Sequence, residues 1–309
     1  MQLIADNTNF EDYFDEQQND AALVKPASEW CEQVIDRFHG ANSQSSWQSI
    51  GWNKTNGLFD LRPGEVTIWA GVNGHGKTTF LSNVMLNIMN DHGAKVCLAS
   101  LEMKPAVSMA KMARQAIGTG QPTVEYIRAF HKWTDGRLWI FDKVGKVAPK
   151  RMLGVATYVR KELGIDHLVI DSLMKCGLGT DDYTAQKDFV DSLCAIAMDT
   201  GLHIHLVCHM RKGEAETKAP DKFDVKGAGE IADMSDNIVI VWKNVRKTSK
   251  DEKDQNSDPD AYVRVAKQRH FEWEGSWAFW FHKDTQQFLE FQGGRPTCVT
   301  LDAQASAFH

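Results

Sequence analysis

The sequence predicts an α/β domain with a mostly parallel, doubly wound sheet and antiparallel strands toward its C-terminal end. Between residues 66 and 209, short apolar runs alternate with stretches of helical periodicity. This alternation is typical of parallel strands that are buried on both faces. After residue 236, apolar runs follow one another without helical patterns between them, which indicates an antiparallel extension.

The individual elements follow from these patterns. Strands are expected at 66–70, 95–100, 138–142, 167–171 and 203–209, and then at 237–242, 261–269, 276–281 and 288–291. Helices are expected near 77–91, 105–117, 149–163 and 184–200. The charged stretch 246–260 is expected to be a loop.

Composition restricts the class of protein. The chain has 309 residues, 42% of them hydrophobic, and a net charge of −6. No apolar run reaches the roughly 18 residues that span a membrane, so no membrane partner is expected. The six cysteines have no metal-ligand spacing, which favours a reducing cytoplasm. The acidity argues against a surface coated in basic charge, but it leaves room for a local anion-binding site.

The domain organisation has four parts. Residues 1–27 are rich in acidic side chains and are expected to form a mobile tail, and residues 28–49 should contain a helix and a polar linker. The ATPase domain described below is expected at 50–292, followed by a C-terminal tail at 293–309. The helix near 28–39 has one apolar face, and two possibilities stay open for it: packing on its own domain, or a tether that leaves it separate.

A phosphate-binding loop is the strongest motif. "GVNGHGKT" (71–78) matches G-x-x-x-x-G-K-[ST] between an expected strand and an expected helix. Its backbone N–H groups and the helix N-terminus favour phosphate, so ATP or another nucleoside triphosphate is the expected ligand. Lys77 would reach the β- and γ-phosphates, and Thr78 would bind Mg²⁺. The expected nucleotide contacts are Gly71, Asn73, Gly74, His75, Gly76, Lys77, Thr78 and Thr79.

Three further polar residues follow apolar strands. Asp171 ends "HLVID" and is expected to be the second Mg²⁺-associated residue. Glu102 follows the next strand after the loop helix, where a carboxylate could orient water, although an exposed loop glutamate remains the alternative. His209 ends "HIHLVCH", at the rim where ligands bind in open α/β sheets, or it is a structural histidine.

Two cations stand two residues apart in "VAKQRHF" (265–271). Because side chains alternate across a strand, Lys267 and Arg269 should project from the same face. Like charges placed side by side repel each other unless they face water or an anion. The residues alone leave open whether these two face solvent or a phosphate.

Together these motifs resemble the RecA-type ATPase domain of ring-forming replicative helicases, the DnaB-like group that includes phage primase-helicases and Twinkle. The resemblance covers about 50–292. It rests on the phosphate loop together with "ASLEMKP" (99–105), "LVIDSLMK" (168–175), "LVCHMRK" (206–212), "VKGAGEIADMSDNIVIVWKN" (225–244) and "VAKQRHFEWEGSWAFWF" (265–281).

The resemblance implies a RecA-like fold, a homo-oligomeric ring that is expected to be a hexamer, Mg²⁺-dependent NTP hydrolysis and translocation on single-stranded DNA. It implies that Glu102 is the catalytic glutamate and His209 the γ-phosphate sensor, and that Lys267 and Arg269 enter the neighbouring subunit's ATP site. The helix near 28–39 would dock on an adjacent subunit. The DNA contacts would be Arg211, Lys212, Lys222, Lys226, Gly227 and Gly229.

The resemblance also implies partners and alternatives. No primase-like or zinc-binding segment precedes the ATPase domain, so a separate primase and a DNA polymerase are expected partners. A stand-alone, phage-encoded motor that works in the cytoplasm of a bacterial host fits this pattern. The competing readings are a RecA/RadA-like recombinase and a KaiC-like regulatory ATPase. Strand displacement would separate the helicase from both.

Overall fold

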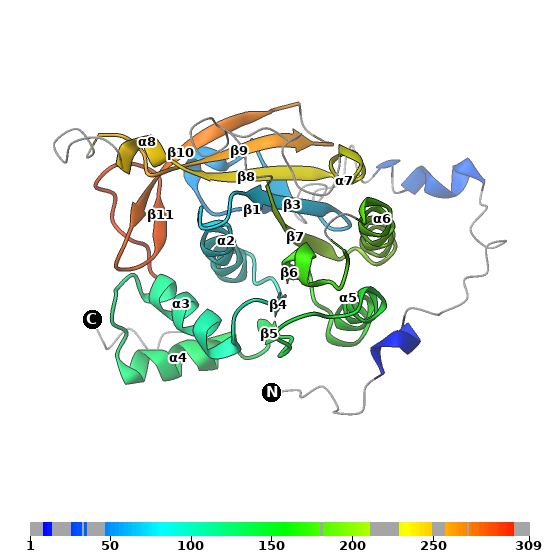
Figure 1. Cartoon of the computed structure of the whole chain (residues 1–309), viewed down its shortest axis with the longest axis horizontal. Coiled ribbons are helices and arrows are strands. Elements are labelled where there is room, and N and C mark those ends of the chain that lie inside the picture. Colours follow the sequence, from blue (N-terminus) through cyan, green and yellow to red (C-terminus); the bar gives the residue numbers. More distant parts are fainter. Residues whose placement is uncertain are drawn as a thin grey trace.

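The computed structural model describes residues 9–13, 26–32, 34–35, 47–179, 182–210, 229–248, 257–270 and 272–299. Nine strands form one sheet in the order β11-β10-β9-β8-β3-β7-β6-β4-β5, with helices on both faces (Figure 1). A separate two-stranded sheet pairs β1 (Gln48–Ser49) with β2 (Asp60–Leu61).

Six neighbouring strands of the large sheet are parallel. They are β3 (Val66–Gly71), β4 (Val96–Ser100), β5 (Leu138–Ile140), β6 (His167–Asp171), β7 (His203–His209) and β8 (Asn237–Lys243). Three antiparallel strands extend the sheet: β9 (Ala261–Gln268), β10 (Gly275–His282) and β11 (Gln287–Leu289). The prediction of strand type was wrong for β8, which pairs in parallel with β3 and only then turns back into β9. No helix separates β8 from β9 in the sequence pattern, so the pattern could not reveal the direction of β8.

Helices cover the two faces of the sheet. In Figure 1, α2 (Lys77–Asp91), α3 (Pro105–Ile117) and α4 (Val124–Thr134) lie on one side, and α5 (Pro149–Leu163) and α6 (Tyr183–Thr200) lie on the other. The shorter helices are η4 (Asn53–Thr55), η5 (Leu173–Lys175), α7 (Gly229–Met234) and α8 (Val245–Thr248). Within the described ranges, no helix combines the length and the apolar character needed to cross a membrane.

The central strand β3 shows how the sequence builds two cores. Its six residues are all buried, and alternate side chains point to opposite faces. Ile68 and Ala70 join the core beneath α5 and α6, whereas Trp69 joins the core beneath α2 and packs near Phe80. The phosphate loop is therefore attached to a strand that is fixed on both sides.

The acidic tail is not structureless throughout, and the prediction for 1–27 was wrong at one place. The short helix η1 (Phe10–Tyr13) packs against α5, and Phe10 is only 8% exposed. Its aromatic side chains find a partner surface that the acidic composition around them did not reveal. A second short helix, η3 (Ala27–Trp30), continues as helical residues at 31–32 and 34–35.

Three histidines stack inside the sheet at the amino ends of β6 and β7. The indole N–H of Trp69 donates to Nδ1 of His205 (3.0 Å), and Nε2 of His205 lies 3.0 Å from Nδ1 of His167. Because an indole nitrogen only donates, Nδ1 of His205 must accept, and the proton of His205 lies on Nε2. His205 therefore donates to Nδ1 of His167, so the proton of His167 also lies on Nε2. From there His167 donates to the amide oxygen of Gln48 (2.9 Å). Burial lowers the pKa of all three histidines, that of His203 to about 4.

This stack predicts acid sensitivity. A histidine with a lower pKa in the folded state binds fewer protons there than in the unfolded chain. Its contribution to the free energy of unfolding is therefore complete above about pH 6.5 and is lost as the pH falls below that value. For each buried histidine, the free energy of unfolding of the protein should fall by up to about 1.4 kcal/mol by pH 5.5. Urea unfolding at pH 7.5, 6.5 and 5.5 would measure this loss. His205→Gln should make the pH dependence shallower, whereas His131→Gln on the exposed face of α4 should leave it unchanged. Equal slopes in the two variants would contradict the assignment.

Candidate functional site

The phosphate loop joins the central strand to the first long helix. β3 ends at Gly71 and α2 begins at Lys77, so residues 72–76 cross the carboxyl end of the sheet. Gly74 and Gly76 have φ values of 81° and 91°, a backbone conformation that favours glycine. A Cβ at Gly71 would overlap the carbonyl oxygen of Val241 on β8. The glycines of the motif are therefore required by the path of the backbone.

Lys77 is buried at the centre of this loop, with 5% exposure. Its ammonium group donates to the carbonyl oxygens of Gly71 (2.9 Å) and Val72 (3.1 Å). Burial lowers the pKa of Lys77, and the nearby carboxylate of Asp171 opposes that shift. The two carbonyl contacts hold the ammonium group against the loop, where it is available to a phosphate that the loop binds.

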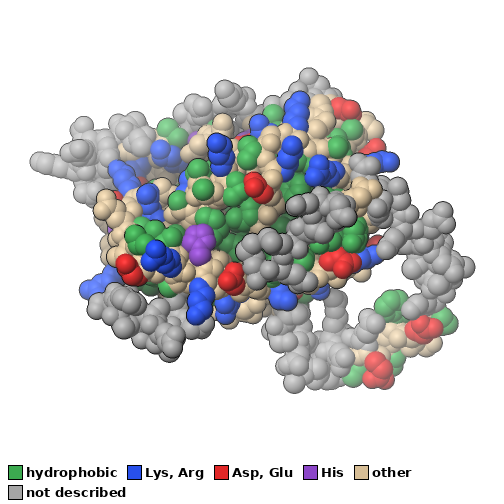
Figure 2. Space-filling model, turned by 90° about the horizontal axis from the view of Figure 1, so that it is seen from below, with side chains coloured by type: hydrophobic (Ala, Val, Ile, Leu, Met, Phe, Trp, Pro, Cys, Tyr) green, Lys and Arg blue, Asp and Glu red, His purple; other side chains and the backbone are tan. Residues whose placement is uncertain are grey.

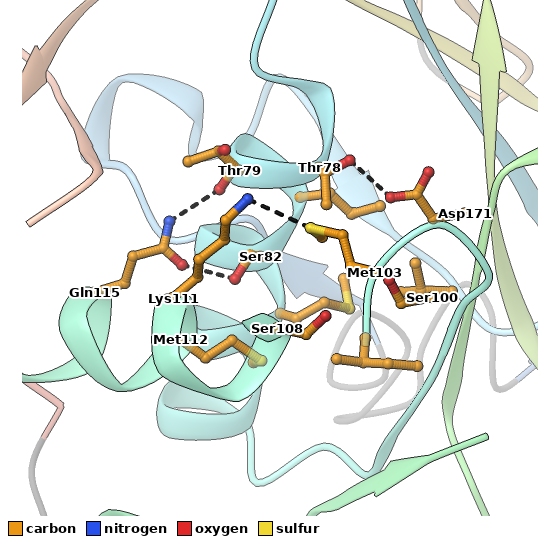
Figure 3. Close-up of a pocket in the computed structure, with 14 residues that line it drawn as sticks. Thr78, Thr79, Ser82, Ser100, Met103, Ser108, Lys111, Met112, Gln115 and Asp171 are labelled. Carbon is orange, nitrogen blue, oxygen red and sulfur yellow. Dashed lines mark hydrogen bonds between the residues drawn. The ribbon is translucent and has the colours of Figure 1, made fainter. Parts of the chain in front are cut away.

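Thr78 and Asp171 meet beside Lys77. The Thr78 hydroxyl donates to Oδ2 of Asp171 at 2.7 Å, as Figure 3 shows. Burial raises the pKa of Asp171, and the hydrogen bond from Thr78 acts in the opposite direction. A hydroxyl and a carboxylate at this spacing supply hard oxygen ligands of the kind that Mg²⁺ prefers. The pair therefore fits the metal that accompanies a nucleoside triphosphate.

Glu102 and His209 lie next to each other beyond Asp171. Ser172 donates its hydroxyl proton to Oε1 of Glu102 at 2.9 Å, and Nε2 of His209 lies 3.7 Å from the same oxygen. The side chain of Glu102 is 37% exposed, so water can reach it. Sequence reasoning missed Ser172, although its position directly after Asp171 in "VIDS" was a usable signal.

The sheet brings these residues together through the order of its strands. Gly71 at the end of β3 pairs with His209 at the end of β7, and Asp171 at the end of β6 pairs with Ser100 at the end of β4. Since β3, β7, β6 and β4 are consecutive in the sheet, their carboxyl ends form one continuous rim. Every nucleotide-handling side chain expected from the strand ends lies on this rim.

A small cavity lined mainly by apolar atoms lies behind the rim, between α2 and α3 (Figure 3). Gln115 spans it, because its amide accepts from Ser82 (2.6 Å) and donates to the carbonyl oxygen of Thr79 (3.1 Å). Lys111 donates to the sulfur of Met103 (3.4 Å), the residue after Glu102. The hydrogen bonds of Gln115 and Lys111 join α3 to α2 and to the segment that carries Glu102. These hydrogen bonds were not predicted from the sequence.

The other expected nucleotide contacts take different positions. His75 accepts a hydrogen bond from the backbone N–H of Lys243 (3.2 Å), which ties the loop to β8. Asn73 is exposed on the loop, and Thr79 lies one position further into α2 than Thr78.

Lys267 and Arg269 both turn toward α7. The Lys267 ammonium donates to the carbonyl oxygens of Ala232, Asp233 and Ser235 at 2.7–2.8 Å. Arg269 donates to the carbonyl oxygen of Met234 (3.1 Å) and pairs with Asp236 (3.1 Å), with its side chain 45% exposed. Cations at the C-terminal end of a helix are stabilised by the orphan carbonyls there.

Strand register separates these two cations from the phosphate loop of their own chain. Lys267 pairs with Ile238 on β8, and Ile238 pairs with Ile68, near the amino end of β3. The loop begins at the other end of β3, about four residues or roughly 13 Å further along. Arg269 lies beyond even that point, since its backbone N–H bonds to Asp236, the residue before β8. Within one chain, Arg269 therefore lies near the amino ends of the parallel strands, and Lys77 lies near their carboxyl ends.

Most of the expected DNA contacts lie outside the described residues. This applies to Arg211, Lys212, Lys222, Lys226 and Gly227. Gly229 is the first residue of α7, the helix whose C-terminal end contacts Lys267 and Arg269. The expected DNA-binding segment thus leads directly into the helix that the two cations hold.

Comparison with known proteins places this site in context. Residues 51–290 match the family described as the DnaB-like helicase C terminal domain. The chain is 21% identical over 280 residues to the Twinkle homolog protein, chloroplastic/mitochondrial, of Arabidopsis thaliana, covering 83% of this chain and 35% of the relative. It is 26% identical over 235 residues to the DNA helicase/primase of Enterobacteria phage T3, covering 68% and 41%. The chain thus spans less than half the length of these relatives.

Solved structures share the fold. The ATPase domain of G40P matches with a TM-score of 0.69 and 19% identity, over 87% of this chain and 99% of that one. A DnaB-like replicative helicase, whose structure was determined with attention to its interactions with primase, matches with a TM-score of 0.68 and 17% identity, over 86% and 67%. These likenesses confirm the predicted RecA-like α/β fold.

Proposed function

This chain belongs to the family of DnaB-like helicase C-terminal domains, and we propose that it is the motor of a ring-shaped replicative DNA helicase, built from six copies. The motor hydrolyses ATP, or another NTP or dNTP, at subunit interfaces and moves along single-stranded DNA. One observation supports the proposal: the side chains expected to handle the nucleotide gather on the rim of β3, β7, β6 and β4, whereas Arg269 lies at the opposite end of the strands.

Each side chain on the rim has a role in this proposal. Bound Mg²⁺ and nucleotide supply the phosphoryl group and the charge neutralisation that the reaction needs. Lys77 contacts the β- and γ-phosphates, and Thr78 with Asp171 holds the metal. Glu102 accepts a proton from the attacking water and is oriented by Ser172, whose hydroxyl bonds its Oε1. His209 would contact the γ-phosphate, and because its Nε2 lies 3.7 Å from Glu102, that contact would affect the position of Glu102.

Arg269 completes the ATP site of a neighbouring subunit. Its distance from the phosphate loop of its own chain excludes a direct contact there, and its side chain is partly exposed. An arginine delivered from a second subunit stabilises the charge that develops in phosphoryl transfer. Each ATP site is then composite, so hydrolysis depends on assembly.

The partners follow from the same proposal. Single-stranded DNA is held by the basic segment around 211–229, where backbone contacts suit a motor that does not read sequence. A primase and a DNA polymerase are its proposed protein partners. The likeness to a helicase/primase of phage T3 supports a phage-encoded motor that works in the cytoplasm of a bacterial host.

The proposal is tested by two assays on the same preparation. We expect ATP hydrolysis to rise when single-stranded DNA is added, and we expect a labelled strand to be displaced from a forked duplex. Stimulation with strand pairing but no displacement would indicate a recombinase. Absence of both responses would indicate a regulatory ATPase and overturn the proposal.

The helical residues at 27–32 and 34–35 form the proposed tether between subunits. Trp30, Val34 and Ile35 are 44–49% exposed, and Figure 1 shows this helix standing away from the domain body. A hollow lined by apolar and polar side chains of α4, β5 and the end of α5 lies on another face, including Leu138, Trp139 and Leu163. Figure 2 shows apolar side chains gathered in the middle of that face. Because an exposed apolar stripe requires a partner surface, we propose that the hollow of one subunit receives the helix of the next.

Trp30→Asp is expected to weaken the oligomer by about tenfold or more in dissociation constant, since a charge would enter an apolar interface. Light scattering after size-exclusion chromatography, over a range of protein concentrations, measures this change. Met198→Asp is the matched control, because Met198 is 70% exposed on α6 and plays no part in the tether. An intact ring in the Trp30 variant at low micromolar concentration would show that the helix packs elsewhere.

A further inference from the structure

Helix α5 carries a glycine in its interior that its own geometry does not require. Gly154 lies in the middle of Pro149–Leu163, where glycine destabilises a helix relative to alanine. A Cβ at this position would overlap the backbone carbonyl of Phe10. The glycine therefore leaves a notch in α5 into which the backbone of the N-terminal segment fits.

Aromatic side chains surround the notch. The ring of Phe10 lies edge-on to Tyr158 (centroids 5.3 Å apart, 87°) and to Phe141 (6.1 Å, 85°). Tyr13 also lies edge-on to the Tyr158 ring (5.1 Å, 89°). Such edge-on pairs stabilise a contact beyond the effect of the apolar area that they bury. Two rings of the segment are thus held by two rings of the domain.

Charge favours the same pairing. The Arg151 guanidinium lies 5.8 Å from the Phe10 ring and 6.0 Å from the Phe141 ring, within the range of cation–π attraction. The segment "NFEDYFDE" (9–16) carries four acidic residues and no basic ones, whereas α5 begins with "PKR". The N-terminal segment is thus acidic and aromatic in sequence, and the helix on which Phe10 docks begins with two basic residues.

We propose that Arg151, Gly154 and Tyr158, together with Phe141, form a binding site for an acidic aromatic peptide, and that residues 9–13 of the same chain occupy it. This docking gives the N-terminal region a second attachment. Thirteen residues separate Tyr13 from Ala27, a reach of at most about 45 Å. The helical residues at 27–32 and 34–35 are thereby attached through the chain to α5 on one side and to β1 on the other. The docking site does not depend on the proposed helicase function, since neither nucleotide nor DNA takes part in it.

A labelled peptide of residues 6–16 tests the site by fluorescence anisotropy on the full chain. The double variant Phe10→Ala/Tyr13→Ala empties the groove and should bind the peptide saturably. Adding Gly154→Leu to that double variant should abolish binding, while α5 persists because leucine favours a helix more than glycine does. Circular dichroism confirms that the triple variant is folded. The unaltered chain should bind the peptide at least tenfold more weakly, because its own tethered segment competes at a high effective concentration.

Charge reversal on α5 offers a second readout without a change in packing volume at the notch. In the emptied chain, Arg151→Glu should weaken peptide binding by about fivefold or more. Lys161→Glu, an exposed position on the same helix outside the groove, should have a clearly smaller effect.

Three results would overturn the proposal. Peptide binding that is equal with and without Gly154→Leu would show that the notch is not the site. No binding to the emptied chain at millimolar peptide would show that there is no site. If the unaltered chain, diluted below its assembly concentration, bound the peptide as well as the emptied chain does, the segment would come from a neighbouring subunit. Resistance to the peptide at every dilution supports docking within one chain.

Discussion

Replacing Glu102 with Gln is expected to lower the rate of ATP hydrolysis by about a hundredfold or more while nucleotide binding is retained. Glutamine keeps the size of the side chain and can still meet the Ser172 hydroxyl, but it cannot take a proton from water. Because Glu102 contacts neither Lys77 nor Thr78 through any hydrogen bond found in the described part of the chain, the phosphate loop should remain intact. ATP-dependent binding to single-stranded DNA should therefore persist.

Lys77→Ala is the informative contrast, because it removes a phosphate contact. Both nucleotide binding and hydrolysis should fall, and ATP-dependent DNA binding should fall with them. Binding of a fluorescent nucleotide, steady-state hydrolysis and DNA binding in the same buffer distinguish the two patterns. Normal hydrolysis by Glu102→Gln would show that another group activates the water.

The rim of the candidate site could be predicted from the sequence because it depends on local signals. A polar residue that ends a buried strand must lie at the carboxyl end of a parallel sheet, and this signal predicts the positions of Asp171 and His209. The contact between His209 and Glu102 could not be predicted in the same way. It depends on the spatial order β7-β6-β4, and a sequence does not state which strands are neighbours.

The failures have equally physical causes. Helix α4 was not predicted, although Thr123 caps it by accepting from the N–H of Tyr126, because its aromatic and β-branched residues do not favour a helix intrinsically. Its stability comes from burying Phe130 and Trp133, which is a tertiary effect. The docking of Phe10 on α5 was hidden for the same reason. A helix glycine indicates a close approach, but it does not identify the segment that approaches.

"VAKQRHF" shows where the prediction from alternation ends. The structure turns both Lys267, in β9, and Arg269, just after β9, toward α7, and the immediate partners of Lys267 are three carbonyl oxygens at the end of that helix. Lys267→Ala would therefore remove hydrogen bonds to the end of α7, in addition to any contact with a phosphate. Arg269, with two partners and a partly exposed side chain, is the better residue for testing action between subunits.

Arg269→Ala is expected to bind ATP nearly normally and to hydrolyse it on the order of a thousandfold more slowly, because arginines supplied to a phosphoryl-transfer site contribute at this scale. The variant also loses the ion pair with Asp236. Asp236→Asn is a useful control for that loss, since it weakens the ion pair but leaves the guanidinium in place. If hydrolysis fell equally in both variants, a structural role for the ion pair would explain the result.

Mixing two inactive variants makes the decisive test of a composite site. Arg269→Ala protein has an intact phosphate loop and no arginine to donate, whereas Lys77→Ala protein has a defective loop and an intact Arg269. In a mixed ring, some interfaces pair the intact loop of one variant with the arginine of the other, so hydrolysis should exceed that of either variant alone.

Co-assembly must be verified with differently labelled proteins, and hydrolysis is measured with and without DNA because strictly sequential firing could suppress recovery on DNA. Hydrolysis is a better readout than unwinding, since a ring with few working sites can hydrolyse ATP and still fail to translocate. An Arg269 that served its own chain would give no recovery in either condition, and the strand register that separates Arg269 from Lys77 argues against that outcome.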